Sequence, residues 1–507
     1  MRLSRLLLAG LVASAALFAH NAAQAADKML RVALEFDPAA LDPATDGSYT
    51  NRVVTTLMCD SLIDLSPDLK FVPELATSWD WAPDRLSLTV HLRAGVVFQD
   101  GTHFDAAAMA ANIQRYKTAR YSIRKAEMAA ISAAEVIDPL TLRIVLSRPY
   151  APLLALLSNR PGTPYSPKQL ALPADQIAAH PVCAGPFAFK ERVAQDHITL
   201  ERFPGYWNAA AIKLPGVVFR TVTDSNIRKV DLAAGGLDIA QKLAPTDVAS
   251  ISANPKLKVF KGPSLGFVPI EFNVANGKAA DTPLGRDPRV RQAFSLAIDR
   301  AALNRVAFDG QYVPSNQMEA PTSAYFNAGH PVPPRDLAAA KKLLAAAGVK
   351  TVVFTLRIGT DPLDTQVAEI IQAMVKDAGF EMKIVAMDGA AMVAATKNGD
   401  FDASMLLWSG RPDPDGNMPI WLTCAGFTNW GKYCNPKFDA AILQGASQQS
   451  EAARKPFYKA ASDIFFADQP DVVLYHWSML WGLSAKVGGF VGRPDGLWRP
   501  EGMTNAP

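Results

Sequence analysis

The chain has 507 residues, of which 49% are hydrophobic and 20% charged, and its formal net charge is +3 at pH 7. A chain of this length exceeds one ordinary domain, so we expect two or three lobes with a sizeable core. The near balance of charges excludes the strongly basic composition typical of proteins that bind nucleic acid or anionic membranes.

The first 25 residues have the order of a secretory signal peptide. Arg2 and Arg5 precede an apolar run over 6–18, and small residues end in Ala23-Gln24-Ala25, which predicts cleavage after Ala25. A transmembrane anchor is the alternative, but the run is shorter than the roughly 20 residues needed to cross a bilayer. No cysteine lies near the cleavage point to accept a lipid. We therefore expect an exported protein that is not lipid-anchored.

The first third of the mature chain reads mainly as short strands. Residues 86–92 alternate apolar and polar side chains, and 140–146 do so more loosely, as half-buried strands should. The segment 105–117 between them is typical of a helix.

After about residue 285 the pattern changes to alternating helices and strands. Asp287 and Asp336 are expected to begin helices, and a third helix, over 367–375, is expected to end at Gly379. Strands are predicted over 352–358, 382–387 and 401–408, with a short helix over 390–397. This βαβαβ succession favours a mostly parallel sheet, in which ligands gather beyond the carboxyl ends of the strands. The loop 409–417 lies at such an end.

The four cysteines are an even number, which suits disulfides in an oxidising compartment. Cys424 and Cys434 enclose a short segment and are predicted to form one bridge, which leaves Cys59 and Cys183 for a second. Three pairings are formally open. A metal site is the alternative, but the cysteine spacings contain no C-x-x-C motif.

One segment matches an enzyme motif. Gly262-Pro263-Ser264-Leu265-Gly266 fits the G-x-S-x-G pattern of serine hydrolases, in which a helix directly follows the serine. Residues 267–273 read instead as a strand, which disfavours a secreted hydrolase using Ser264. We predict no catalytic residue and no cofactor.

The last quarter of the chain holds two further signals. Asp413-Pro414-Asp415-Gly416-Asn417 resembles part of a calcium loop, but it lacks the third alternate ligand and the terminal glutamate, so a turn is the better interpretation. Aromatic side chains also gather there, among them Trp408 and Trp477. Most of them should be core, yet pockets for small solutes are lined by several aromatics and a few fixed polar groups.

Several blocks of sequence occur in order along nearly the whole mature chain. The first runs from Pro73-Glu74-Leu75-Ala76-Thr77-Ser78-Trp79 to Leu92-Arg93-Ala94-Gly95-Val96-Val97-Phe98-Gln99-Asp100-Gly101. The later ones are Ala184-Gly185-Pro186-Phe187, Glu271-Phe272-Asn273, Asp287-Pro288-Arg289-Val290-Arg291-Gln292-Ala293, Gly399-Asp400-Phe401-Asp402 and Asn435-Pro436-Lys437-Phe438-Asp439. Together they resemble the extracellular solute-binding proteins of family 5, the peptide, opine and nickel group.

The resemblance implies an α/β, two-lobed clamshell of the periplasmic-binding-protein type II, with an extra subdomain in lobe one. Lobe one would hold 26–265, including the inserted subdomain at about 65–180. Lobe two would hold 266–479, and 480–507 would return to lobe one.

The resemblance also implies a non-catalytic role in the periplasm. The protein would capture a peptide or a peptide-like, carboxylate-bearing solute by lobe closure and deliver it to ABC-transporter permease subunits in the inner membrane. Binding of nickel, haem or an opine in the same fold is the alternative. We expect a monomer with no nucleic-acid partner.

The resemblance places ligand contacts at Ala184 and Gly185, at Phe272 and Asn273, and in the loop after Trp408, with Trp477 as a further candidate. In dipeptide-binding members that loop reads W-[ST]-G-D, and the aspartate pairs with the peptide's amino group.

Here Arg411 follows Trp408-Ser409-Gly410, and a guanidinium suits a carboxylate rather than an ammonium. Asp413 or Asp415 could supply the lost negative charge. Otherwise the solute lacks a free amino group or carries extra carboxylates.

Overall fold

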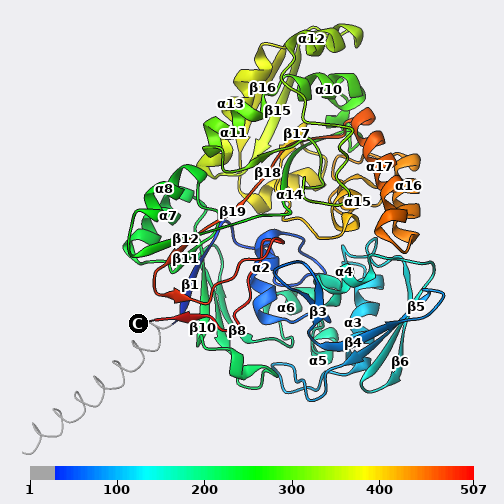
Figure 1. Cartoon of the computed structure of the whole chain (residues 1–507), viewed down its shortest axis with the longest axis vertical. Coiled ribbons are helices and arrows are strands. Elements are labelled where there is room, and N and C mark those ends of the chain that lie inside the picture. The colour runs from blue at the N-terminus through cyan, green and yellow to red at the C-terminus, as the bar shows by residue number, and fades with distance from the viewer. Residues whose placement is uncertain (1–28, 507) are drawn as a thin grey trace, which may run out of the picture.

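The computed structural model describes residues 29–506, so the predicted signal peptide and its cleavage point lie outside the described residues. Two lobes, each built on its own β-sheet, lie one above the other (Figure 1). This arrangement confirms the two-lobed α/β architecture.

Lobe one contains a seven-stranded mixed sheet. Its order is β12 (Leu257–Gly262), β19 (Met479–Ser484), β11 (Ile239–Ala240), β1 (Leu30–Leu34), β10 (Gly216–Thr221), β9 (His197–Arg202) and β8 (Phe187–Val193). Strand β1 pairs in parallel with both β10 and β11, so the carboxyl ends of these three strands meet at one edge. Helices α2 (Tyr49–Met58) and α7 (Ser225–Ala234) also belong to this lobe.

A smaller four-stranded antiparallel sheet forms the subdomain of lobe one. Its order is β4 (Ala76–Trp81), β5 (Ser87–Leu92), β7 (Thr141–Leu146) and β6 (Ile131–Asp138). Helix α3 (Ala106–Thr118) packs in one hydrophobic cluster with this sheet. Its N-cap Asp105 accepts a hydrogen bond from Ala108 N. The two strands and the helix predicted here are confirmed.

Lobe two is built on a six-stranded sheet. Its order is β14 (Val313–Pro314), β18 (Asp471–His476), β13 (Phe267–Phe272), β17 (Ala403–Met405), β15 (Val352–Ile358) and β16 (Phe380–Ala386). Strand β15 pairs in parallel with β16 and with β17, as the βαβαβ pattern predicts.

The crossover helices of lobe two are α13 (Pro362–Lys376) and α14 (Gly389–Lys397). Helices α10 (Pro288–Leu296), α11 (Arg300–Phe308), α12 (Leu337–Ala346), α16 (Pro436–Ser447) and α17 (Glu451–Asp468) complete the lobe. Asp287 and Asp336 are N-caps, as predicted.

The predicted strand over 401–408 is too long at both ends, since β17 covers only three residues. Beyond Met405 the chain faces Pro269 of β13, which has no N–H to donate to the ladder. Leu406 N still donates a hydrogen bond to the Pro269 carbonyl oxygen at 3.2 Å, and an isolated bridge then joins Phe267 to Trp408. Trp408 is therefore the last residue of this segment to pair with β13, and it lines the inter-lobe cavity.

The chain crosses between the lobes from β12 to β13 and from β18 to β19. The second crossing supplies interior strands to both sheets, because β18 lies between β14 and β13 and β19 lies between β12 and β11. The expected lobe limits at 265 and 479 fall at these crossings and stay predictions.

Two disulfides confirm the cysteine pairing. Cys59 joins Cys183 with a Cα–Cα distance of 5.2 Å, and Cys424 joins Cys434 at 4.4 Å. The first bridge ties the end of α2 to the segment before β8, and the second closes a short loop of lobe two.

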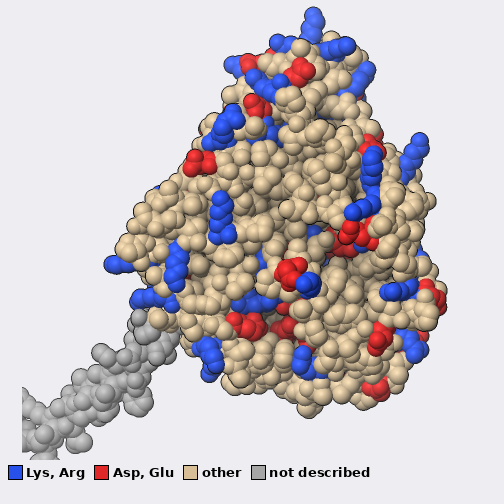
Figure 2. All heavy atoms as spheres, in the orientation of Figure 1, with Lys and Arg blue, Asp and Glu red and all other residues tan. Residues whose placement is uncertain are grey.

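The surface carries charges of both signs. Figure 2 shows Lys and Arg interspersed with Asp and Glu on the viewed face, and neither sign forms one continuous patch there. Over residues 29–506, no helix combines the length and the apolar character that a membrane span requires.

Candidate functional site

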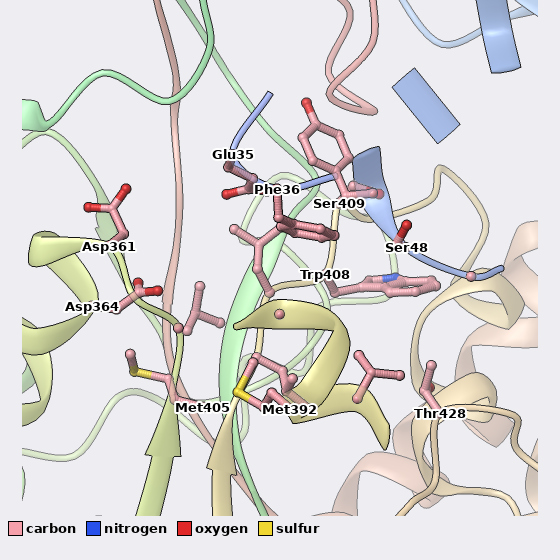
Figure 3. A pocket seen from close by; sticks show the side chains of 18 of the residues that line it. Glu35, Phe36, Ser48, Asp361, Asp364, Met392, Met405, Trp408, Ser409 and Thr428 are labelled. Atoms are coloured by element: carbon pink, nitrogen blue, oxygen red, sulfur yellow. The ribbon is translucent and has the colours of Figure 1, made fainter. Parts of the chain in front are cut away.

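A cavity of about 260 Å³ lies between the lobes. Lobe one contributes Glu35 after β1, Tyr49 of α2 and Lys242 after β11, whereas lobe two contributes the 359–364 segment and Trp408. Several of these side chains are seen from close by in Figure 3. The cavity thus lies beyond the carboxyl ends of parallel strands in both sheets, where such folds hold ligands.

Aromatic rings line much of the cavity. Trp408 meets Trp421 edge to face with centroids 6.0 Å apart, and Phe427 lies 6.2 Å from Trp408. Tyr49 of lobe one meets Trp477 across the lobe boundary at 6.4 Å. These rings provide the apolar lining typical of small-solute sites.

Trp477 depends on a glycine beside the lobe crossing. Its indole Nε1 donates to the Trp408 carbonyl oxygen at 3.2 Å. A Cβ on Gly266 would lie 2.0 Å from that nitrogen, so only glycine leaves room for the ring. The two predicted tryptophans are therefore held together by one hydrogen bond.

One side of the cavity carries the charged residues Glu35, Lys242, Asp361 and Asp364, which we name the acidic wall. Lys242 and Glu35 form an ion pair within lobe one. Asp361, the N-cap of α13, accepts hydrogen bonds from Arg228 at 2.7 Å and from the Ser225 hydroxyl at 2.8 Å. Because Arg228 and Ser225 belong to α7, these bonds connect the two lobes.

The two aspartates of this wall differ in pKa. Burial raises the pKa of Asp364 to about 6, a rise opposed by Lys242 and supported by Asp361 and Glu35. Burial acts in the same direction on Asp361, but the Arg228 guanidinium and the Leu363 N–H outweigh it and hold that pKa below its ordinary value. Both groups are ionised at neutral pH.

On the opposite side of the cavity lie Gly47, Ser48, Trp408 and Ser409, which we name the arginine-backed wall, and Asp46 lines the cavity beside them. In Figure 3, Ser48 and Trp408 lie across the view from Asp361 and Asp364. Three buried guanidinium groups lie behind this wall.

These three guanidinium groups bond to neutral groups of the wall. Arg411 donates to the Ser409 hydroxyl at 2.9 Å and covers the Trp408 ring at 4.5 Å. Arg160 donates to the Gly47 carbonyl oxygen at 3.1 Å. Arg52 donates to Ser409 at 3.5 Å and pairs with Asp495 at 2.7 Å.

Arg411 is only 5% exposed and lies behind the cavity lining. Burial lowers its pKa well below the ordinary value, and the like charges of Arg52 and Arg160 add to that effect. Its positive charge reaches the cavity through the Ser409 hydroxyl, a group that can donate its own proton to a solute oxygen.

Asp413 and Asp415 face away from the cavity. Asp413 pairs with Arg454 of α17 at 2.7 Å, and Asp415 accepts a hydrogen bond from the Tyr458 hydroxyl of the same helix. The residues 413–417 form a turn, as predicted. In this structure neither aspartate replaces the negative charge that is missing at Arg411.

The remaining predicted contacts also lie outside the cavity lining, because they pack the fold. The Ala184 carbonyl oxygen accepts a hydrogen bond from Asp60 N at 2.7 Å. A Cβ on Gly185 would lie 2.3 Å from the Met58 carbonyl oxygen. Phe272 packs edge to face on Phe294, and the Asn273 amide donates to the Phe401 carbonyl at 2.9 Å.

Ser264 lacks the surroundings of a nucleophile. Its hydroxyl accepts a hydrogen bond from Gly266 N at 2.9 Å, and strand β13, not a helix, follows it. Both ring nitrogens of His476 face backbone carbonyl oxygens, those of Gly266 and Gln317. Within the described chain, no group of three or more His, Cys, Asp or Glu side chains could hold a metal ion.

Comparison with known proteins agrees with the fold. The glutathione-binding protein GsiB of Pectobacterium atrosepticum is 28% identical over 96% of this chain and 96% of its own length. The structure of the Escherichia coli murein tripeptide binding protein MppA matches with a TM-score of 0.86 at 22% identity, covering 95% of this chain and 99% of that one. DppA from Helicobacter pylori, in complex with the peptide STSA, matches at 0.85 and 23% identity, covering 96% and 100%.

A family model described as bacterial extracellular solute-binding proteins, family 5 Middle, matches residues 70–429. Proteins of this family are periplasmic transport proteins rather than enzymes, and they bind solutes such as peptides and deliver them to ABC permeases. The match covers most of the chain, which therefore belongs to bacterial extracellular solute-binding protein family 5.

Proposed function

We propose that this protein captures a short peptide-like zwitterion in the cavity between its lobes and delivers it to the permease subunits of an ABC importer. The observation that carries this proposal is that both lobes line one cavity. A solute that contacts residues of both lobes binds the closed arrangement better than an open one, so it shifts the protein toward closure. The signal peptide, the absence of a lipid anchor and the monomeric state belong to the same proposal.

Glutathione is the first compound to test, because the GsiB relatives are named for binding it. It is a short peptide with one amino group and two carboxylates, so it offers charges of both signs to two walls of different character. At about 260 Å³ the cavity is near the lower end of the size range of small-molecule pockets, which favours a solute of this size over a long peptide.

Isothermal titration calorimetry on the purified mature protein tests the proposal. The panel consists of glutathione, di- and tripeptides, opines, and nickel with histidine. We expect saturable binding of at least one peptide-like zwitterion, with the compound recovered unchanged. Binding of nickel-histidine alone, or hydrolysis of a bound peptide that Ser264→Ala abolishes, would contradict the proposal.

A further inference from the structure

The charges of the acidic wall do not cancel. Three carboxylates, those of Glu35, Asp361 and Asp364, face two cations, Lys242 and Arg228. Glu35 is paired with Lys242 and Asp361 with Arg228. Over residues 29–506, the Asp364 carboxylate has neither a hydrogen bond nor an ion pair, so one negative charge is left over.

The position of Asp364 keeps this charge at the cavity. The residue lies in the first turn of α13 and lines the cavity. A Cβ on Gly359 would lie 2.7 Å from Asp364 Oδ2, so glycine at that position leaves space for the carboxylate.

Two tyrosine rings, Tyr312 and Tyr475, line the same part of the cavity and stack with centroids 5.5 Å apart. Burial raises the pKa of both phenols, and the charge of Asp364 adds to the rise, so both rings stay neutral. Neutral aromatic faces beside a carboxylate favour an organic cation.

An unpaired carboxylate in an enclosed site is costly, and such groups are candidates for functional sites. A protonated amine in the cavity would remove the cost by forming a charge-assisted hydrogen bond. Lys242 does not supply that amine, because it is paired with Glu35.

We propose that Asp364 determines specificity by pairing with the protonated amine of the captured solute. This inference rests on the proposed capture function and adds an orientation: the amine lies at the acidic wall and the carboxylate at the arginine-backed wall. The loop with Arg411 would then contact the solute's carboxylate. In dipeptide-binding members of the family, the corresponding W-[ST]-G-D loop contacts the peptide's amino group.

The test uses two pairs of probes, each a free amine with its N-acetylated form: glutathione with N-acetylglutathione, and tri-alanine with N-acetyl-tri-alanine. Calorimetry at pH 7.5 should show that acetylation weakens binding to the unaltered protein about tenfold, the value of one charge-assisted hydrogen bond. Asp364→Asn should weaken binding of the free amines by a similar factor and leave the acetylated compounds unchanged.

Glu369→Gln is the matched control. It removes an exposed carboxylate from the same helix, outside the cavity lining. It should leave the affinities for all four probes unchanged.

A pH series on the unaltered protein gives a second measurement, which is independent of whether Asp364→Asn folds. As the pH falls from 7.5 to 5, Asp364 takes up a proton, so affinity for the free amines should fall while affinity for the acetylated probes changes less. Of the neighbouring groups, Glu35 is ion-paired with Lys242 and Asp361 with Arg228, and the Tyr312 and Tyr475 phenols stay neutral over this range.

The outcomes are distinct. If no probe in either pair binds, the capture of peptide-like zwitterions fails and the inference fails with it. If free and acetylated forms bind equally well, or if Asp364→Asn still discriminates between them, capture stands and the role of Asp364 is overturned.

Discussion

The two walls of the cavity present charge in different ways. At the acidic wall, carboxylates and one ammonium group face the cavity directly. At the arginine-backed wall, the guanidinium groups of Arg52, Arg160 and Arg411 lie behind the lining and act on it through hydroxyl and carbonyl groups. A solute therefore meets charged side chains directly at the acidic wall. At the arginine-backed wall it meets hydroxyl, carbonyl and aromatic groups, beside which the Asp46 carboxylate accepts hydrogen bonds from Ser48 N and Ala40 N.

Charge and contact are therefore separate properties of this binding site. A buried guanidinium contributes field to the cavity without touching the solute, and it also fixes the neutral group that does the touching. Four substitutions test whether the two walls act in these different ways.

Asp495→Asn should have the largest effect, because it unbalances the arginine-backed wall. Arg52 and Asp495 have side chains only 4% and 1% exposed. Removing the acid leaves Arg52 buried near Arg411 and Arg160, at a cost of about 3 kcal/mol in the free energy of unfolding. Denaturant unfolding measures this. Asp68→Asn, at an exposed ion pair, should change nothing measurable, and a similar small loss for Asp495→Asn would show that the wall tolerates the excess charge.

Trp408→Ala should strongly weaken solute binding, because the Trp408 ring lines the cavity and the Arg411 guanidinium lies on its face. We expect about 30-fold weaker binding of glutathione, or about 2 kcal/mol, as for other central aromatic contacts. Titration calorimetry measures the loss. Trp81→Ala, in the four-stranded subdomain, is the control and should bind normally.

Arg411→Met should separate the effect of the Arg411 charge on solute binding from the effect of its side-chain packing on stability. Methionine fills similar space without the charge, so we expect about fivefold weaker binding of glutathione together with unchanged or slightly higher stability, as for other buried charges without a carboxylate partner. Arg454→Met is the comparison, because Arg454 is paired with Asp413 and its loss should destabilise the protein. If Arg411→Met bound glutathione with unchanged affinity, Arg411 would not contribute to binding of the solute's carboxylate.

Asp364→Asn should have the smallest effect, on stability without solute. The folded pKa of about 6 lies above the ordinary value of 3.8, so the folded state favours the protonated acid. The stabilising contribution of this acid is complete below the unfolded pKa and is lost as the pH rises through 6. The free energy of unfolding of Asp364→Asn should therefore exceed that of the unaltered protein by on the order of 1 kcal/mol at pH 8 and should equal it near pH 4, after allowance for the partial exposure of Asp364. Thermal unfolding at both pH values measures the difference.

Local patterns were sufficient to predict much of lobe two. Strand β15 has the predicted limits, and Asp287 and Asp336 begin helices, because periodicity and capping depend on neighbouring residues. The strand at 401–408 was overestimated because Pro269, which interrupts its ladder, is remote in sequence.

The site was less predictable than the fold. Trp408 and Trp477 were predicted as candidates for ligand contact, and both line the cavity, although most aromatics in this part of the chain were expected to be core. Glu35, Lys242 and Asp364 were missed, because they follow strands of two different sheets that only the packing of the two lobes brings together. For Glu35 and Lys242, the position just after a short apolar strand was the available signal, and for Asp364 it was the first turn of the helix that follows β15. The sequence also showed the charge of Arg411. It did not show that the Arg411 side chain would lie over the Trp408 ring, behind the cavity lining.

The second inter-lobe crossing has a consequence for how this chain folds. Strands β18 and β19, at residues 471–484, complete the interior of both sheets although they are nearly the last strands in the sequence. A growing chain therefore lacks a member of each core until residues 471–484 have been synthesised. Such long-range pairing slows folding, so neither lobe should reach its native state much before the other.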